Sequence, residues 1–275
     1  MPAVPRVSVL MPVLNPHPIY FREAVESVLN QTWSDFELLI IEAPGETSAG
    51  PLLANYHDER IRHLALDHRP GLVGQLNLGI SQCSAEYIAR MDADDICLSD
   101  RLMLQVALLD GESSVAAVGG QLQIINEHGQ TIARRAYPCD SQAISQRLRF
   151  HNPLAHPSVM YRKSVVQAAG GYRVLPLRGV EDYDLWSRLD QQGQQLANLP
   201  NDLLRYRVHA GASKVTTMRE QLQATIDLKR EHYAGQLNLP ARIRLLAERG
   251  LLLVPTSLVL WLFSWTQYRA AKQAT

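Results

Sequence analysis

Three carboxylates stand within four positions of this chain, directly after an apolar run. Asp92, Asp94 and Asp95 follow residues 86–91, which have the length and composition of a buried strand. Carboxylates this close repel one another and resist removal from water. Side chains two apart in an extended strand point the same way, so Asp92 and Asp94 are expected to converge on one cation.

The chemistry of such a cluster has two interpretations that stay open at this point. An EF-hand calcium loop is excluded, because it needs Gly and Glu where this chain has Cys97 and Met103. A hard divalent cation shared between carboxylates and a substrate phosphate fits the pattern. A solvated turn, in which Asp95 or Ser99 caps the helix that begins near Asp100, fits it as well.

The elements that must position the cluster alternate between strands and helices over the first hundred residues. Strands are expected at 7–13, 36–41, 61–66 and 86–91, and helices at 20–33 and around Val73, Leu76 and Ile80. This alternation predicts an α/β fold with a doubly wound, mostly parallel sheet. Ligands of such sheets bind beyond the carboxyl ends of the strands, which is where the aspartates lie.

The pattern changes after Gly111. Residues 115–126 and 131–137 flank a likely turn sequence and predict a hairpin, and 158–162 predict a short strand. A helix is expected over 181–192 with Leu185, Trp186 and Leu189 inward, and another from about 213 to 233.

Composition narrows the function class. Lys plus Arg and Asp plus Glu are 27 each, so no basic field for nucleic acid exists. The three cysteines are odd in number and widely spaced, which predicts reduced thiols and a cytoplasmic location. No signal peptide is expected from the first residues.

Five motifs in order resemble the family 2 glycosyltransferases. They are residues 9–15 (VLMPVLN), 77–80 (NLGI), 85–88 (AEYI) running into 92–95 (DADD), 181–186 (EDYDLW) and 206–209 (YRVH). The resemblance covers about residues 5–215. It implies a GT-A fold that binds a nucleotide-diphosphate sugar, with Asp92 on the nucleotide side and Asp94 on a Mn²⁺ or Mg²⁺ that bridges the diphosphate.

The same resemblance assigns the catalytic half. Asp182 would be the general base of an inverting transfer, with Glu181 beside it, and His209 would approach the metal. The alternative for the acidic pair is structural, because acidic residues favour the first turn of any helix.

Arg69 and Arg101 are candidates for phosphate contact or for structural roles. Trp186, with His151 and His156, is a candidate for the acceptor pocket, against core packing as the other interpretation.

The expected substrate-binding residues are drawn from both halves of the chain: Pro12, Asn15, Glu42, Arg69, Gly71, Asn77, Asp92, Ala93, Gly171, Tyr172 and Trp186. One position departs from the family pattern. Where the family has an Asp-Asp-Gly-Ser stretch whose aspartate contacts the base, this chain has Glu42 and Ala43. The identity of the donor base is therefore open, with uridine or another base that has an imide donor as the default.

The expected organisation is a GT-A domain over 1–215, divided into a nucleotide-sugar half (1–110) and an acceptor half (111–215), and a helical extension over 216–275. Residues 251–265 are largely apolar, but fifteen helical residues reach only about 22 Å against a hydrocarbon core of ~30 Å. Gly250, Ser257 and Ser264 recur every seven residues. An interfacial membrane helix and a helix buried in a domain or homo-oligomer interface both fit this segment.

The function expected from these features is sugar transfer from a nucleotide-diphosphate sugar to a glycan or lipid-linked acceptor in cell-envelope polysaccharide biosynthesis. The reaction would take place in the cytoplasm at the inner face of the plasma membrane. Two alternatives are a catalytically degenerate sugar-nucleotide-binding partner of a glycan assembly complex and a nucleotidyltransferase.

Overall fold

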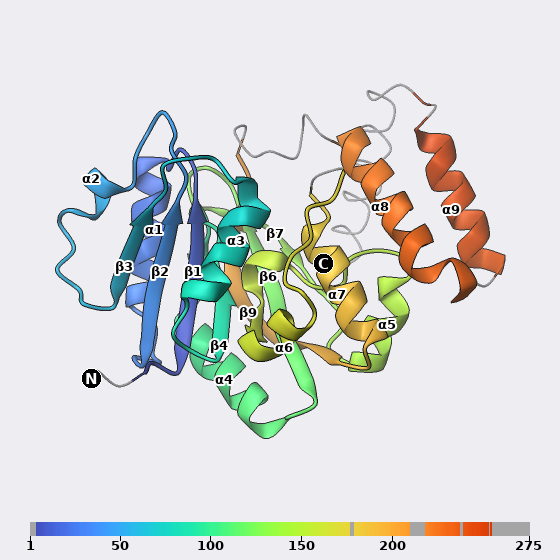
Figure 1. Ribbon diagram of the computed structural model, residues 1–275, viewed down its shortest axis with the longest axis horizontal. Helices are drawn as coiled ribbons and strands as arrows, with labels where there is room; N and C mark the ends of the chain where they lie inside the picture. The colour runs from blue at the N-terminus through green and yellow to red at the C-terminus, as the bar shows by residue number, and fades with distance from the viewer. Residues whose placement is uncertain (1–3, 177–178, 210–217, 237–238, 253, 255–275) are drawn as a thin grey trace.

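The structure, a computed structural model, describes residues 4–176, 179–209, 218–236, 239–252 and 254 (Figure 1). The strands are β1 (Val7–Val13), β2 (Phe36–Glu42), β3 (Ile61–Ala65), β4 (Tyr87–Arg90), β5 (Ile96–Cys97), β6 (Val115–Ile125), β7 (Thr131–Arg135), β8 (Met160–Arg162) and β9 (Gln195–Arg207). The helices are α1 (Pro18–Leu29), α2 (Gly50–Leu53), α3 (Gly71–Gln82), α4 (Arg101–Gly111), α5 (Ser141–Leu148), α6 (Lys163–Ala168), α7 (Glu181–Gln191), α8 (Met218–Tyr233) and α9 (Leu239–Leu251).

All nine strands belong to one sheet with the order β3-β2-β1-β4-β8-β6-β9-β5, and β7 pairs with β6. The first four strands, β1 to β4, pair in parallel. β8 then runs antiparallel to both β4 and β6, while β6 and β9 are parallel. The parallel strands β1 to β4 end at the same edge of the sheet. There β4 leads into the acidic cluster of Asp92, Asp94 and Asp95.

Helices cover both faces of this sheet, as the doubly wound arrangement requires. Alternate side chains of β1 point to opposite faces. Val9 and Met11 pack with α1 and α4, whereas Leu10 packs with α3 and with the cluster that includes α7. Because both faces are covered, β1 and β2 are buried along their whole length, which explains why their sequences are almost continuously apolar.

Most predicted elements are confirmed, including the hairpin of β6 and β7 and the short strand β8. Two predictions about the acidic segment are wrong. Residues 91–95 form a turn after β4 instead of continuing an extended strand. Neither Asp95 nor Ser99 caps the next helix, because the N-cap of α4 is Asp100 and the Gln31 side chain accepts from Leu102 N–H at 3.1 Å.

The helical extension begins with α8, which packs on α7, and α9 packs on α8 (Figure 1). Most of the apolar segment 251–265 lies outside the described residues, and so does the start of the helix expected from 213. Among the described residues, none of the helices combines the length and apolar character that a membrane crossing needs.

Candidate active site

The acidic turn, residues 92–95, lies at the carboxyl end of β4. One carboxylate oxygen each from Asp92, Asp94 and Asp95 lies within 4.8 Å of the others. Asp95 is buried, and burial raises its pKa well above the ordinary value, with further contributions from the charges of Asp92 and Asp94. The turn thus brings together three carboxylates. Their oxygen atoms are the ligands that a hard cation prefers.

Each carboxylate of the turn is held by a different basic residue or backbone group. Asp92 Oδ1 pairs with Arg90 Nη2 at 2.6 Å, and Asp94 Oδ2 lies 3.0 Å from His209 Nε2. Asp95 Oδ1 accepts the backbone N–H of Arg207 at 2.9 Å. The cluster is therefore positioned from β4 on one side and from the end of β9 on the other.

The donor set fits a divalent cation. Asp94 and His209 are adjacent, as the sequence analysis predicted for the two metal-side residues. The buried Asp95 Oδ2 has no hydrogen-bond partner among the described residues. Carboxylate oxygens suit Mg²⁺ and Mn²⁺, and the imidazole nitrogen of His209 offers a further ligand atom beside them. Asp94 and His209 are the residues that would hold the ion, with Asp92 and Asp95 at its margin.

Arg90 is a buried cation at the centre of this region. Burial opposes its charge, but the neighbouring Asp92 carboxylate outweighs this and raises the arginine pKa, so Arg90 stays charged. Its Nε and Nη1 atoms have no hydrogen-bond partner among the described residues. The charge of Arg90 also acts on Tyr172 and Asp182, which connects the acidic turn with the first turn of α7.

Asp182 lies in that first turn and is half-buried. Its Oδ2 accepts a hydrogen bond from Asn152 Nδ2 at 2.6 Å, and its Oδ1 accepts the N–H of Tyr183 at 2.8 Å. Burial and then the charge of Glu181 raise the pKa of Asp182 to about 7, despite the opposing effect of Arg90. A carboxylate with this pKa can accept a proton near neutral pH.

Asn77 connects the two halves of the site through the backbone of Tyr172. Its Nδ2 donates to the Tyr172 carbonyl at 2.8 Å, and its Oδ1 accepts the Tyr172 N–H at 2.9 Å. The preceding Gly171 has φ +66°, and a Cβ there would lie 2.6 Å from Asn77 Oδ1. Glycine at position 171 therefore leaves room for Asn77 of α3, which holds the backbone of Tyr172 in the loop that leads to α7.

Four other predicted residues gather around the carboxyl ends of β1 and β2 and the start of α3. Asn15 Oδ1 accepts the N–H of Glu46 at 2.5 Å, and Arg69 Nε donates to the Pro44 carbonyl at 2.6 Å. Glu42 is buried, and its two carboxylate oxygens contact Ala49 N–H and His63 Nε2, both at 2.7 Å. Gly71 begins α3 with φ +72°. Ala93 lies in the acidic turn itself.

Several predicted residues lie inside the protein. Pro12 is buried within β1, where it lies opposite Ile41 of β2. Trp186 is fully buried and packs on His156 and Tyr161, which agrees with core packing. Arg101 is buried and donates to the Arg90 carbonyl at 2.7 Å, which is a structural role.

Asp184 lies two residues after Asp182 on α7 and has a structural role. Asp184 is fully buried on α7 and pairs with Arg173, Arg188 and His232. Burial alone would raise its pKa, but the hydrogen bonds and positive charges of these partners outweigh burial and lower it. Asp184 therefore anchors α7 to α8 and is not exposed to substrate.

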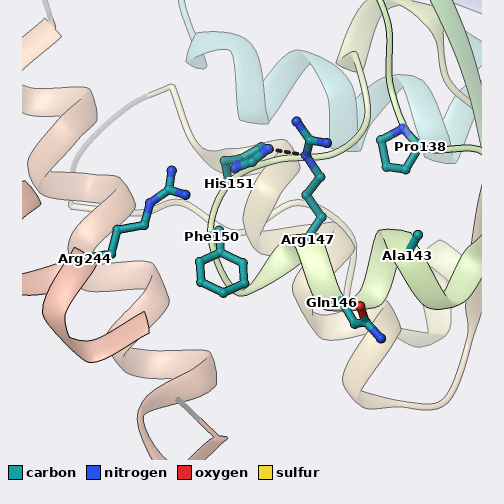
Figure 2. Close-up of a pocket in the computed structure, with 7 residues that line it drawn as sticks. All are labelled: Pro138, Ala143, Gln146, Arg147, Phe150, His151 and Arg244. Atoms are coloured by element: carbon teal, nitrogen blue, oxygen red, sulfur yellow. Dashed lines mark hydrogen bonds between the residues drawn. The ribbon is translucent and has the colours of Figure 1, made fainter. Parts of the chain in front are cut away.

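A separate hollow lies between α5 and α9, as Figure 2 shows. Its lining consists of Pro138, Ala143, Gln146, Arg147, Phe150, His151 and Arg244. Arg147 Nε donates to His151 Nε2, and burial together with the charges of Arg147 and Arg244 lowers the histidine pKa to about 4. The hollow contains neither the acidic turn nor Asp182, so it is distinct from the candidate active site.

Three residues that the sequence analysis missed complete the site: Arg90, Asn152 and Arg207. A charged residue inside the apolar run 86–91 was a local signal for Arg90. Arg207 lies within the motif 206–209, but its role had no local signal, and Asn152 had none at all, because each acts on a carboxylate far away in the sequence.

Comparisons with known proteins show the family and the fold of the chain. The sequence profile described as Glycosyl transferase family 2 matches residues 8–169. The O-antigen biosynthesis glycosyltransferase WbnJ of Escherichia coli is 35% identical over 212 residues, which cover 74% of this chain and 80% of WbnJ. The amylovoran biosynthesis glycosyltransferase AmsE of Erwinia amylovora is 31% identical over 215 residues, which cover 77% and 79%.

Among solved structures, S. aureus TarS 1-349 in complex with UDP-GlcNAc has the same fold. The TM-score is 0.63 at 16% sequence identity, over 88% of this chain and 71% of TarS. This likeness confirms the α/β GT-A fold with its helical C-terminal region. The profile match spans more than half of the chain, and the chain therefore belongs to glycosyl transferase family 2.

Proposed function

We propose that this glycosyltransferase transfers a sugar, with inversion, from a nucleotide-diphosphate sugar to a hydroxyl of a glycan or lipid-linked acceptor. The pathway we propose is cell-envelope polysaccharide biosynthesis, which the names of WbnJ and AmsE support. The UDP-GlcNAc complex of TarS supports a uridine nucleotide donor. A cytoplasmic location at the inner face of the plasma membrane stays a prediction.

The observation that carries this proposal is the coupling of the acidic turn to Asp182. Arg90 pairs with Asp92 and lowers the pKa of Asp182, while Asn77 holds the loop before α7. The carboxylate cluster that would bind the donor and the base that would act on the acceptor are thus connected through Arg90 and the loop before α7. A transferase that uses both substrates at once needs both parts.

In this mechanism Asp92 would contact the nucleotide, and Asp94 with His209 would hold a divalent cation, Mn²⁺ or Mg²⁺. The bound cation would stabilise the negative charge that develops on the diphosphate. Asp182 takes the proton of the acceptor hydroxyl as its oxygen bonds to the anomeric carbon, and the bond from that carbon to the diphosphate oxygen breaks. Attack from the face opposite the leaving group inverts the configuration.

The degenerate sugar-nucleotide-binding partner is the second candidate, and one observation favours it. Both carboxylate oxygens of Glu42 already contact Ala49 N–H and His63 within the chain. A glutamate engaged in this way has less capacity to select a nucleotide base. Intact Asp94, Asp182 and His209 favour the enzyme.

A nucleotide-sugar screen with and without Mn²⁺ tests the proposal. We expect one nucleotide sugar to raise the melting temperature more with Mn²⁺ than with EDTA, because ligands of the native state stabilise it. We also expect release of the nucleoside diphosphate when an acceptor is added. Stabilisation without any release over a panel of acceptors would favour the degenerate partner, and stabilisation by no nucleotide sugar would overturn the proposal.

A further inference from the structure

The hollow between α5 and α9, which we call the α5–α9 hollow, is lined by two arginines and a histidine (Figure 2). Its volume is about 380 Å³, which lies in the range of pockets that bind small molecules. Arg147 lines it from α5 and Arg244 from α9, and Figure 2 shows the imidazole of His151 between their guanidinium groups. Among the described residues, those that line the hollow include no Asp or Glu.

The positive charge at this hollow is only partly balanced. Arg244 Nε donates to Glu248 Oε1 at 3.1 Å, but the same carboxylate also pairs with Lys229 at 2.7 Å. Burial and the nearby positive charges together lower the pKa of His151 to about 4. These charges are those of Arg147, Arg244 and Lys229, and the charge of Glu248 opposes them. An excess of positive over negative charge favours an anion in the hollow.

The hollow also offers hydrogen-bond donors to a ligand. His151 Nε2 accepts the N–H of Arg147 Nε, so the neutral ring carries its hydrogen on Nδ1. Neither Nδ1 of His151 nor the two Nη groups of Arg147 have an acceptor among the described residues. Pro138, Ala143 and Phe150 form an apolar wall beside these donors. An apolar wall with a few polar groups is typical of a small-molecule pocket, and guanidinium groups bind phosphate and carboxylate oxygens in pairs.

The chain segment that lines the hollow also holds the candidate base. Asn152, which follows His151, donates to Asp182 Oδ2 at 2.6 Å. The backbone carbonyl of Leu148 accepts a hydrogen bond from the hydroxyl of Tyr183, the residue after Asp182. The end of α5 and the residues after it therefore contact the first turn of α7 and line the hollow at the same time.

We propose that the α5–α9 hollow binds an anionic group of the acceptor, a phosphate or a carboxylate, while the acceptor hydroxyl lies at Asp182. This inference rests on the proposed function, because it gives the acceptor of that reaction a second point of contact. A second contact fixes the hydroxyl relative to the base. A neutral acceptor would leave the charges of Arg147 and Arg244 without a ligand partner.

Titration of small sugars in EDTA tests the hollow without a metal at the donor site. The probes are glucose 1-phosphate for the phosphate, glucuronic acid for the carboxylate and glucose as the neutral control. We expect the NMR signals of the His151 imidazole to shift saturably with at least one anionic probe and not with glucose. The tighter of the two anionic probes identifies the group that the hollow prefers.

The double substitution Arg147→Gln with Arg244→Gln should weaken binding of the anionic probe by about tenfold or more, because charge-assisted hydrogen bonds are lost. Arg230→Gln is the matched control. Arg230 is an exposed arginine of α8 that does not line the hollow, so this variant should bind the probe like the parent. In transfer assays the parent should prefer an anionic acceptor to its neutral analogue by about tenfold or more in kcat/KM, and the double variant should lose this preference.

Three results would overturn the proposal: equal shifts with glucose and the anionic probes, unchanged probe binding by the double variant, and equal weakening by Arg230→Gln. Nucleotide-sugar binding with Mn²⁺ is a separate readout, which the double variant should retain and which shows that it is folded. Absence of that binding in the parent would count against the proposed function. Intact nucleotide-sugar binding without a response to either anionic probe would count against the hollow alone.

Discussion

Asp182 and Asp184 stand two residues apart on α7 and have opposite properties. Asp184 is surrounded by Arg173, Arg188 and His232, which keep it ionised and structural. Burial and then the charge of the neighbouring Glu181 raise the pKa of Asp182 to about 7, although hydrogen bonds from an amide and a backbone N–H oppose this rise. The environment of each carboxylate, and not its place in the motif, decides which one can act as a base.

Asp182→Asn should reduce sugar transfer by at least about a hundredfold, because general base catalysis is typically worth that much or more. Asparagine keeps the size of the side chain and removes its basicity. Steady-state transfer kinetics measure the loss. Glu181→Gln is the comparison and should lose less. Near-parent turnover by Asp182→Asn would place the base elsewhere.

Transfer should depend on the ionisation of Asp182. With a pKa of about 7, kcat/KM should rise with pH and level off above about pH 7. The raised pKa also means that the stability due to this group is present below about pH 4 and is lost as pH rises through about 7. The free energy of unfolding of Asp182→Asn should therefore fall less over that interval than the parent's. A midpoint of the kcat/KM pH profile near 3.8, the ordinary pKa of an aspartate, would contradict the assignment of Asp182 as the base.

Arg90 should act as a positioning residue between the two ends of the site. Removing its charge by Arg90→Met should raise the pKa of Asp182 and move the midpoint of the transfer pH profile upward, because Arg90 lowers that pKa. Arg90→Lys keeps a charge and should move the midpoint less. An unchanged midpoint in Arg90→Met would leave Arg90 with a purely structural role.

At the scale of elements, the sequence predicted those whose patterns are local. β1, β2, α3 and the hairpin of β6 and β7 have clear apolar periodicity or turn residues, and they form where expected. β9 was missed, because Asn198, Pro200 and Asn201 interrupt its apolar residues. Its long pairing with β6 depends on contacts between distant segments, which local patterns do not report.

The candidate site was predictable to the same extent. The motifs predicted Asp92, Asp94, Asp182 and His209, but the partners Asn152 and Arg207 come into place only when the loop after α5 reaches α7 and the end of β9 reaches the acidic turn. Burial of Trp186, which the helical pattern predicted, is confirmed.

The loop between α6 and α7 should be sensitive to a single methyl group. Gly171→Ala should cost about 1–2 kcal/mol for its left-handed backbone, and more because its Cβ would displace Asn77. Gly193→Ala is the matched control, with φ +78° and no atom within 4 Å of the added Cβ. Denaturant unfolding measures both costs. Equal losses would show that contact with Asn77 is not what requires glycine at 171.

On the scale of the whole molecule, the two predicted halves share one sheet. β5, from the first half, pairs with β9 from the second, and β8 is inserted between β4 and β6. The backbone of β9 reaches the acidic turn through Arg207. The two predicted halves are therefore joined in one sheet, although the proposed mechanism gives them separate tasks.

That separation is tested most directly by calorimetric titration of the nucleotide sugar identified by the screen, with Mn²⁺ and with EDTA, into the parent, Asp94→Ala and Asp182→Asn. The account predicts that the parent and Asp182→Asn bind within a few-fold of each other with Mn²⁺ and far more weakly with EDTA, because a base acts on bond formation and not on donor binding. Asp94→Ala should bind weakly under both conditions. Equally tight binding by the parent in EDTA, or parent-like Mn²⁺ dependence in Asp94→Ala, would contradict the central claim that the acidic turn holds the donor through a divalent cation.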